Sequence, residues 1–377
     1  MDGEGEVWVG SYDHAAGTTE VAVLSENLGG DDHSNPSILV LPDGRVMAFY
    51  SAHCGEAIWS RVTIASEDIT EWSEQRAITG VRPFFRSRWG YTYANAVRLE
   101  GENGRIYVFY RGPDFKQWFV MSDDGRSWTE EKPLMRGPGT KPYFKYASNG
   151  DEAIHIAFTD GHPRAEETNS IYYMRYTNGA FFKANGSEIK SLEELPVSPG
   201  EADKVYDGAA DGVRSWIWDI AVDDLGHPVL VYAVFPAPDD HRYRYARWNG
   251  TQWLDCEITS GGSSFPDTRT RRRGRSGRPL HYLSGGAAVD PSTTSLLYLS
   301  REVHGVHEVE EWSTPDAGLT WSARPVTSGS ETDNVRPVVP RASVPGAPEV
   351  LWLSGSYDDY DAYDMGVWMF IPSLVEP

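Results

Sequence analysis

The sequence DDHSNPSILVLPDGRVMAFYSAHC, residues 31–54, decides the fold because it reads as a single β-hairpin. Two apolar runs, Ser37–Leu41 and Val46–Tyr50, flank the turn Pro42–Arg45. Short apolar runs separated by a Pro-Asp-Gly turn are typical of paired antiparallel strands. In such a pair the start of the first strand and the end of the second lie at the same edge of the sheet, away from the turn.

Two histidines flank this hairpin at that shared edge. His33 and Asn35 precede the first strand, and His53 follows the second. Imidazoles change protonation state near neutral pH, so two of them in one pocket would suit a site that moves a proton. Two unrelated surface histidines are the alternative, and the recurrence of the hairpin along the chain favours the shared pocket.

The hairpin pattern recurs five more times, and repetition of this kind is the signature of a repeat architecture. The further copies span residues 93–111, 143–160, 216–235, 283–301 and 335–354. A four-stranded unit that repeats about every fifty to seventy residues predicts an all-β chain folded as a β-propeller.

Turns of the form Ser/Thr-x-Asp-x-Gly-x-Thr-Trp follow several of these hairpins. Ser122–Trp128 and Thr314–Trp321 are good copies, Ser66–Trp72 is a degenerate one, and Trp248–Trp253 keeps the turn and the tryptophan. In such a turn the aspartate can accept backbone N–H groups while the tryptophan covers the space between neighbouring sheets. We interpret these boxes as structural.

Length and composition favour one large domain, residues 1–377. The chain has 14 Trp, 20 Tyr and 37 Gly residues, which suits many short strands joined by tight turns. Six blades are countable, and we predict a seven-bladed ring closed by pairing of strands within 335–370 with those at 7–12 and 19–24. A seventh blade could also be split between the linkers 186–211 and 260–279. A large β-sandwich is the alternative fold, which the box turns disfavour.

The formal charge of −21 argues against a nucleic-acid partner, because the molecule as a whole repels polyanions. A basic cluster from Arg269 to Arg278 interrupts this charge, and its Thr/Arg/Gly composition is more typical of an exposed loop than of a nucleic-acid patch. The sequence shows no membrane-spanning run and no signal peptide. We expect a monomer that acts outside the cytoplasm, in the secreted or periplasmic space, after loss of a signal peptide; a cytoplasmic location is the alternative.

The strand ends at the edge of His33 and His53 collect polar, cationic and aromatic side chains from every blade. They are Asn35, Tyr93, Asn95, Arg111, Lys141, Tyr143, Lys145, His162, Trp216, Trp218, His241, Tyr243, Arg301 and Arg336. Arginine and lysine bind carboxylates and sulfates, tryptophan faces accept sugar rings, and histidine and tyrosine exchange protons. Together they predict a funnel that binds an acidic saccharide.

Several segments resemble one family of repeat propellers. They are DDHSNPSILVLPDGRVMAFYSAH (31–53), GYTYANAVRL (90–99), FYRG (109–112), WIWDIAVDDLGHPVLVYAVFP (216–236) and NVRPVVPR (334–341). The resemblance is to the BNR/Asp-box repeat propellers that include ulvan lyases and the lyases that cleave rhamnose-to-glucuronate linkages. Members of that family are seven-bladed.

The resemblance implies a polysaccharide lyase that works by β-elimination at a uronic acid. His33 and Tyr93 would be the base and the acid, in either order. Arg111 would neutralise the substrate carboxylate, and His53 would support it or hold the substrate. A weak C–H acid needs this charge stabilisation in place before its proton leaves. No metal cofactor is required in this scheme. The family sometimes carries a structural calcium or zinc ion, and no ligand cluster in the sequence assigns one.

Two other functions remain open at this point. A sialidase-type glycoside hydrolase would place three arginines around a carboxylate, and Arg111, Arg301 and Arg336 come from three separate blades. The Arg-Ile-Pro signature expected near its first blade is absent. A non-catalytic carbohydrate-binding propeller would use the tryptophans and cations but would have no use for a His33/Tyr93 pair. The sequence therefore favours the lyase.

Overall fold

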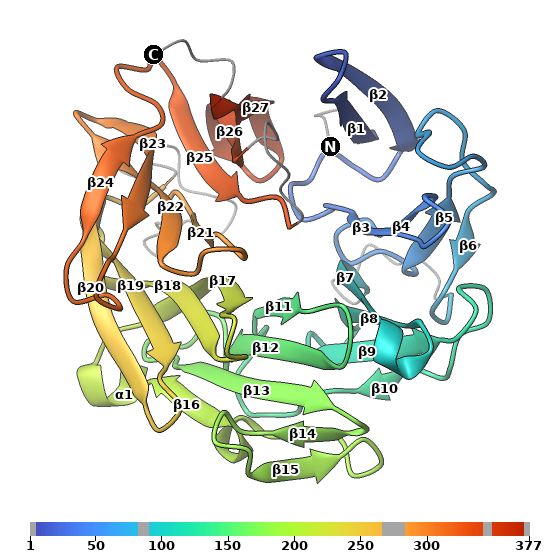
Figure 1. Ribbon diagram of the computed structural model, residues 1–377, viewed down its shortest axis with the longest axis horizontal. Coiled ribbons are helices and arrows are strands. Elements are labelled where there is room, and N and C mark those ends of the chain that lie inside the picture. Colours follow the sequence, from blue (N-terminus) through green and yellow to red (C-terminus); the bar gives the residue numbers. More distant parts are fainter. Residues whose placement is uncertain (1–4, 82–89, 266–282, 342–348, 373–377) are drawn as a thin grey trace.

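The computed structural model describes residues 5–81, 90–265, 283–341 and 349–372 and arranges antiparallel sheets around a central axis (Figure 1). The predicted all-β propeller is confirmed. The basic cluster Arg269–Arg278 lies outside the described residues. In the part of the chain that the structure describes, the helices are too short to cross a membrane.

Six sheets of three or more strands form the blades. The first two are β3 (Ser37–Val40), β4 (Val46–Tyr50), β5 (Trp59–Val62) and β6 (Arg76–Ala77), then β7 (Thr92–Leu99), β8 (Arg105–Arg111), β9 (Gln117–Ser122) and β10 (Lys132–Pro133). The third is β11 (Phe144–Ser148), β12 (Ala153–Thr159), β13 (Ile171–Thr177), β14 (Ala180–Phe182), β15 (Glu188–Ser191) and β16 (Asp203–Tyr206).

The last three blades follow the same order from the axis outward. They are β17 (Ser215–Val222), β18 (Pro228–Ala237), β19 (Asp240–Trp248) and β20 (Trp253–Gly262), then β21 (Ala287–Val289), β22 (Leu296–Val303), β23 (Val306–Ser313) and β24 (Ser322–Pro325), then β25 (Asp333–Val338), β26 (Val350–Asp359) and β27 (Ala362–Phe370). Short helices η1 (Glu100–Glu102), η2 (Pro199–Glu201) and α1 (Gly208–Asp211) connect strands. Each of the six predicted hairpins is the inner strand pair of a blade.

The linker at 186–211 is part of the third blade. β15 pairs with β14, and β16 pairs with β13, so this segment widens an existing sheet. It does not contribute to a seventh blade, because both of its strands are hydrogen-bonded to strands of the third.

Among the described residues, no strand pairing joins the two ends of the chain, so the predicted closure is wrong, and the ring has six blades where seven were predicted. β1 (Val7–Asp13) and β2 (Thr18–Ser25) pair with each other, and β26 lies between β25 and β27. β27 supplies the third strand of the last blade from its own hairpin, so no N-terminal strand is needed there. The two-stranded β1–β2 sheet lies between the last and first blades in place of a seventh (Figure 1).

Hydrogen bonds across this seam join the last blade to the loop before β3. The Asp32 N–H donates to the carbonyl of Tyr360 at 2.9 Å, and the Tyr357 hydroxyl donates to Asp32 Oδ2 at 2.6 Å. The loop that carries His33 is therefore tied to the last blade.

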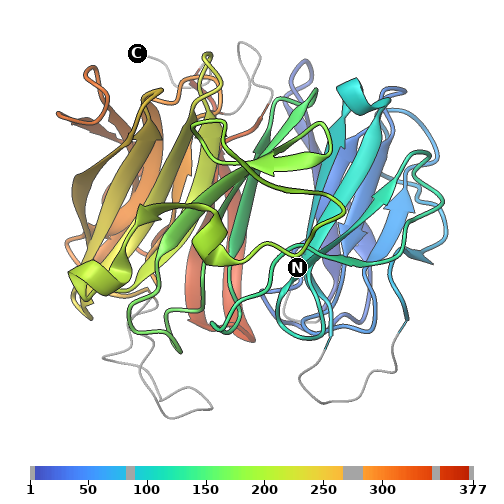
Figure 2. The same ribbon diagram turned by 90° about the horizontal axis from the view of Figure 1, so that it is seen from below.

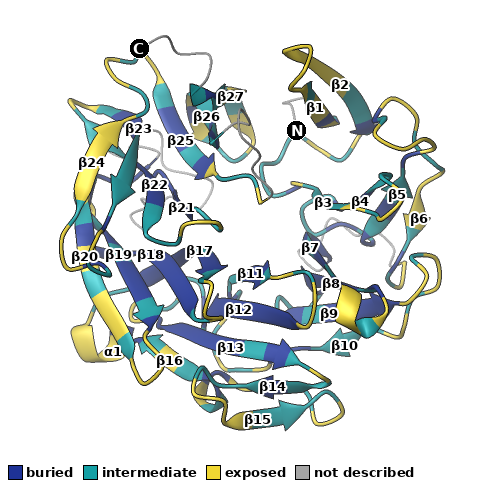
Figure 3. Ribbon diagram, in the orientation of Figure 1, coloured by how far each residue is buried: buried dark blue, intermediate teal, exposed yellow. Residues whose placement is uncertain are grey.

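Tryptophans of the box turns pack against the preceding blade, as predicted. Trp128 meets Phe49 edge-on at 5.7 Å between ring centroids, and Trp321 meets Tyr245 at 5.3 Å. In the better box, Asp124 accepts the backbone N–H groups of Arg126 and Ser127. Inner strands are mostly buried, whereas the outer strand β24 is exposed and β20 is only partly buried (Figure 3), so the core lies between neighbouring sheets. The side view shows the strands running between two loop-bearing faces (Figure 2).

Candidate active site

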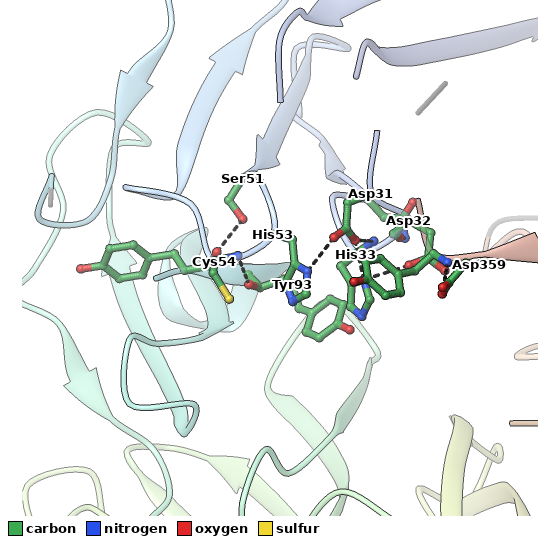
Figure 4. Close-up of polar contacts among 12 residues, drawn as sticks. Asp31, Asp32, His33, Ser51, His53, Cys54, Tyr93 and Asp359 are labelled. Atoms are coloured by element: carbon green, nitrogen blue, oxygen red, sulfur yellow. Dashed lines mark hydrogen bonds and ion pairs between the residues drawn. The ribbon is translucent and has the colours of Figure 1, made fainter. Parts of the chain in front are cut away.

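Two stacked imidazoles form the centre of the candidate site. The loop before β3 positions His33, and the loop after β4 positions His53. Their rings are 4.0 Å apart and nearly parallel, with an interplanar angle of 7°. The carboxylate of Asp31 bridges them, 2.5 Å from His33 Nδ1 and 2.7 Å from His53 Nδ1 (Figure 4). The hairpin argument thus placed both histidines correctly.

Two carboxylates keep His33 protonated. Burial works to lower the pKa of His33, but the hydrogen bonds with Asp31 and Asp32 outweigh it and raise this pKa to about 10. Burial conversely raises the pKa of Asp31, and its bonds to the two histidines lower it well below its usual range. His33 is therefore an imidazolium at neutral pH, with Nδ1 committed to the carboxylates and Nε2–H left to donate.

A bulge in β7 places Tyr93 beside His33. The pairing of β7 with β8 shifts between Thr92 and Asn95, and Tyr93 has a φ of +61°, in the left-handed region. Its ring lies 5.7 Å from that of His33, and its hydroxyl is 3.5 Å from the Tyr143 hydroxyl. Burial raises the pKa of Tyr93 well above 10, while the Arg111 charge opposes this rise.

Arg111, at the end of β8, is a buried cation, and two of its nitrogens make no hydrogen bond to the described residues. Its side chain is 3% exposed, and its guanidinium carbon lies 4.6 Å from the Tyr93 ring centroid. Nε and Nη2 have no hydrogen-bond partner among the described residues. An unpaired buried guanidinium carries a large desolvation penalty, which a bound anion would offset.

Lys141 supplies a second cation next to Arg111. Its Nζ lies 4.5 Å from the ring centroid of Phe115, over which Arg111 also lies at 5.6 Å. Burial, followed by the Arg111 charge, lowers the pKa of Lys141. This end of the site is thus positively charged, as an anion-binding funnel requires.

An aromatic row leads from Tyr93 toward Arg336. Tyr143 lies 4.3 Å from Trp216, and Trp216 lies 6.3 Å from Trp218. Trp216 and Trp218 are only 9% and 6% exposed, so they offer little ring area for the predicted stacking of a sugar. His162 contacts Tyr143 and Trp216 edge-on, and burial, followed by the Lys141 charge, lowers its pKa to about 3.

Several predicted substrate ligands lie elsewhere. His241 and Tyr243 are 0% exposed in β19, and the Tyr243 hydroxyl donates to the Ser300 carbonyl, so both side chains are enclosed within their blade and their contact with substrate stays a prediction. They belong to the third strand of their blade, one strand too far from the axis. Arg301 forms an ion pair with Glu310, with 2.6 Å between Nε and Oε2.

The remaining predicted ligands have mainly local roles. Asn35 is exposed, and its amide donates to the Asp32 carbonyl at 2.6 Å, which shapes the His33 loop. Asn95 is half-buried in the β7 bulge. Burial lowers the pKa of Lys145, and the negative charge of Asp219 opposes this shift, so the two groups attract each other.

Sequence reasoning missed the groups that set the charge of the site. Asp31 and Asp32 were quoted with the hairpin but received no role, although two carboxylates directly before a histidine are a visible signal. Phe115 carried no signal, because it lies in a loop beyond β8. The bond from the Tyr357 hydroxyl to Asp32 also had no sequence signal, because the two residues are 325 positions apart.

Asp31, His33 and His53 are also the one group among the described residues with the composition of a metal site. Their N–O contacts of 2.5 and 2.7 Å are hydrogen-bond distances. Ligand atoms around a tetrahedral zinc would be separated by about 3.4 Å, given Zn–N bonds of about 2.0–2.1 Å. In the present geometry these contacts are hydrogen bonds, and the three side chains would have to move apart to coordinate an ion.

Fold and site together define the class. Residues 1–260 match the family model described as "BNR repeat-containing family member", and the chain belongs to this family. Its curated relatives include two ulvan lyases. One, from Pseudoalteromonas sp. (strain PLSV), is 22% identical over 66% of this chain and 58% of its own length. The other, from Alteromonas sp. (strain LOR), is 23% identical over 66% and 56%.

The chain thus spans little more than half the length of these relatives. A solved structure of a polysaccharide lyase PL25 ulvan lyase bound to -[GlcA(1-4)Rha3S]- superimposes with a TM-score of 0.72. It covers 97% of this chain and 86% of its own, at 16% identity. At that identity, the likeness shows the shared propeller fold.

Proposed function

We propose that this protein is a polysaccharide lyase that cleaves a glycosidic bond to a uronic acid by β-elimination. The observation that carries the proposal is Arg111, a buried guanidinium with unpaired donors. Arg111 lies over the ring of Tyr93, and Tyr93 in turn lies beside the His33 imidazolium. A uronate carboxylate bound there would have its charge neutralised before the C5 proton leaves, as elimination requires.

The protonation states suggest an order for the two proton transfers. With a pKa of about 10, His33 already holds its proton and is suited to donate it from Nε2 to the leaving oxygen at C4. Tyr93 is then the base: its phenolate takes the C5 proton, the C4–O bond breaks and a C4=C5 double bond forms. The high pKa of Tyr93 makes the phenolate scarce but strongly basic, which suits a weak C–H acid.

The names of the related proteins support a rhamnose-glucuronate polymer as the substrate. Both curated relatives are named ulvan lyases, and the related structure holds a glucuronate linked to a sulfated rhamnose. We propose ulvan or another rhamnose-glucuronate polymer as the substrate and a secreted or periplasmic place of action for a monomeric enzyme. We further propose that no metal takes part, because Arg111 and His33 supply the positive charge that a metal would otherwise supply.

The hydrolase and the binding module have less support. The arginine triad of a sialidase-like site needs three available cations, and Arg301 is paired with Glu310. A binding propeller would expose its tryptophans, whereas Trp216 and Trp218 are buried. It would also gain nothing from the Asp31-bridged histidines.

Ultraviolet absorbance tests the proposal. The purified protein is mixed with ulvan, gum arabic and other uronate polysaccharides, with EDTA and without it. Elimination leaves an absorbing unsaturated uronate, and we expect such a product from at least one rhamnose-glucuronate polymer at an equal rate under both conditions. New reducing ends without absorbance would instead establish a hydrolase, and loss of the signal in EDTA would contradict the metal-free mechanism.

A further inference from the structure

A continuous row of six side chains follows the inner strands of the ring and ends in a cation on each side. The row is Arg111, Tyr93, Tyr143, Trp216, Trp218 and Arg336, with successive separations of 4.6, 5.7, 4.3, 6.3 and 5.1 Å. In the proposed reaction, Arg111 is the guanidinium that neutralises the substrate carboxylate. Arg336, at the far end, has no part in it.

The backbone at Arg336 is held in an unfavourable conformation. Its φ is +57°, which residues other than glycine rarely adopt. The Arg336 N–H donates to the Gly285 carbonyl at 2.6 Å. Gly286 lies so close that a Cβ there would be 3.1 Å from the Arg336 Cα. Backbone strain that the surrounding structure enforces in this way is concentrated at functional sites.

The Arg336 side chain is positioned, and its charge acts on Asp32 and Tyr357 only through space, where, against the effect of burial, it works to lower the pKa of both groups. The guanidinium carbon lies 5.1 Å from the Trp218 ring centroid, and Trp218 is itself anchored by its Nε1–H bond to Ser284 Oγ at 2.8 Å. Among the described residues, no carboxylate lies within 4 Å of the guanidinium to form an ion pair. The nearby carboxylate of Asp32 is taken up by His33 and Tyr357.

We propose that Arg336 binds an oxyanion of the substrate, a sulfate ester or a second carboxylate, on a sugar other than the one that is cleaved. This inference rests on the lyase function proposed above. Arg111 and Arg336 then recognise two acidic groups of one polymer from the two ends of the row. Trp218 acts as the positioning residue for the Arg336 guanidinium.

The test compares Arg336→Asn with Arg336→Lys in kinetics on ulvan and on the same ulvan after desulfation. Asparagine tolerates a positive φ and removes the charge, whereas lysine keeps the charge but cannot bind bidentately. Arg45→Asn is the matched control, because Arg45 pairs with Asp43 in the turn at the opposite end of the first hairpin. Circular dichroism confirms folding of each variant.

We expect Arg336→Asn to raise the KM for ulvan roughly ten- to hundredfold, the loss of a charged hydrogen bond, with kcat nearly unchanged. Arg336→Lys should be intermediate and Arg45→Asn normal. If the defect disappears on desulfated ulvan, the oxyanion is a sulfate; if it persists, the oxyanion is a carboxylate. Equal KM values for Arg336→Asn and the unmodified protein on both polymers, or a loss confined to kcat, would overturn the proposal.

Gly286→Ala provides a second route that leaves the charge in place. Its Cβ would push against the Arg336 backbone, so it should raise the same KM. Gly179→Ala controls for positive-φ strain, because its Cβ would meet nothing within 4 Å. Retardation of the variants in gels that contain ulvan measures binding without turnover. The two proposals can therefore fail separately. If the gel retards the unmodified protein but not Arg336→Asn, and no variant forms an unsaturated product, then Arg336 binds the polymer and the lyase proposal is wrong.

Discussion

At the residue scale, the chemistry of the site depends on how tightly two carboxylates hold one imidazolium. His33 Nδ1 lies 2.5 Å from Asp31 and 2.9 Å from Asp32. Because the pKa of His33 rises from 6.5 to about 10 on folding, its contribution to stability is fully present below about pH 6.5 and is lost as the pH rises through 10. The same proton is the one that we assign to the leaving oxygen.

Replacing Asp31 should therefore move the pH at which activity levels off. In the unmodified protein we expect the rate to rise with pH as the phenolate of Tyr93 forms, and to level off near pH 10, where the loss of the His33 proton begins to offset the further gain of phenolate. Asp31→Asn removes one carboxylate partner of His33, so the rate should level off at least about one pH unit lower. The pH profile of kcat/KM measures this, with Asp43→Asn as the control. An unchanged levelling-off point would show that His33 is not the acid.

Tyr93→Phe should lower the turnover rate sharply, because it removes the hydroxyl that takes the C5 proton. A positioned base contributes about 10²–10⁴-fold, and we expect a loss of that size with the fold intact. His33→Ala should have a comparable effect. Tyr245→Phe is the matched control, since that hydroxyl donates only to the Thr294 carbonyl. Ultraviolet rates on ulvan measure all three, and a Tyr93→Phe variant with a near-normal rate would remove Tyr93 from the mechanism.

At the scale of single elements, bulges in the innermost strands aim side chains into the funnel. Tyr93 in β7, Trp218 in β17 and Arg336 in β25 each lie where the pairing with the next strand shifts register. A bulge inserts one unpaired residue, bends the strand and redirects the side chain. Three blades use the same device at the same strand, which explains why the site gathers there.

Those bulges mark the limit of what the sequence could predict. Alternating apolar residues and turn signals located all six hairpins, and hairpin geometry alone brought His33 and His53 together. A register shift does not change the alternation of apolar residues in the sequence. The orientations of the Trp218 and Arg336 side chains therefore could not be predicted from the sequence. His241 was placed in the funnel because a strand end in sequence does not reveal its distance from the axis.

The box turns stabilise the junctions between blades without touching the funnel. Trp128→Ala removes the ring that packs on Phe49, which should lower the free energy of unfolding by about 2–3 kcal/mol. Kinetics below the melting temperature should be unchanged. Trp368→Ala is the control, because that side chain is 59% exposed on β27 and its loss should have little effect. Thermal and denaturant unfolding compare the two, and equal stability losses would contradict the packing role of the box.

At the scale of the whole molecule, the seam of the ring and the catalytic loop are the same place. The loop before β3 is tied to the last blade through Asp32, Tyr357 and Tyr360. Asp32 also contacts His33, so the imidazolium depends on contacts made by residues more than 300 positions away in the sequence. The propeller must therefore close before the His33 imidazolium, the proposed acid, is held in place. A partly folded chain would lack this group in its protonated position.

The net charge of −21 and the cationic funnel act on a polyanionic substrate in opposite directions. The repulsion acts at long range and is screened beyond about 10 Å at 0.1 M salt, whereas the partly buried contacts of Arg111, Lys141 and Arg336 are screened less. Added salt should first raise kcat/KM on ulvan, by removing the repulsion, and then lower it as the contacts within the funnel weaken. Initial rates at subsaturating ulvan, from about 10 mM to 1 M sodium chloride, should therefore pass through a maximum. A monotonic fall from the lowest salt would mean that the local cations dominate the approach of the polymer as well as its binding.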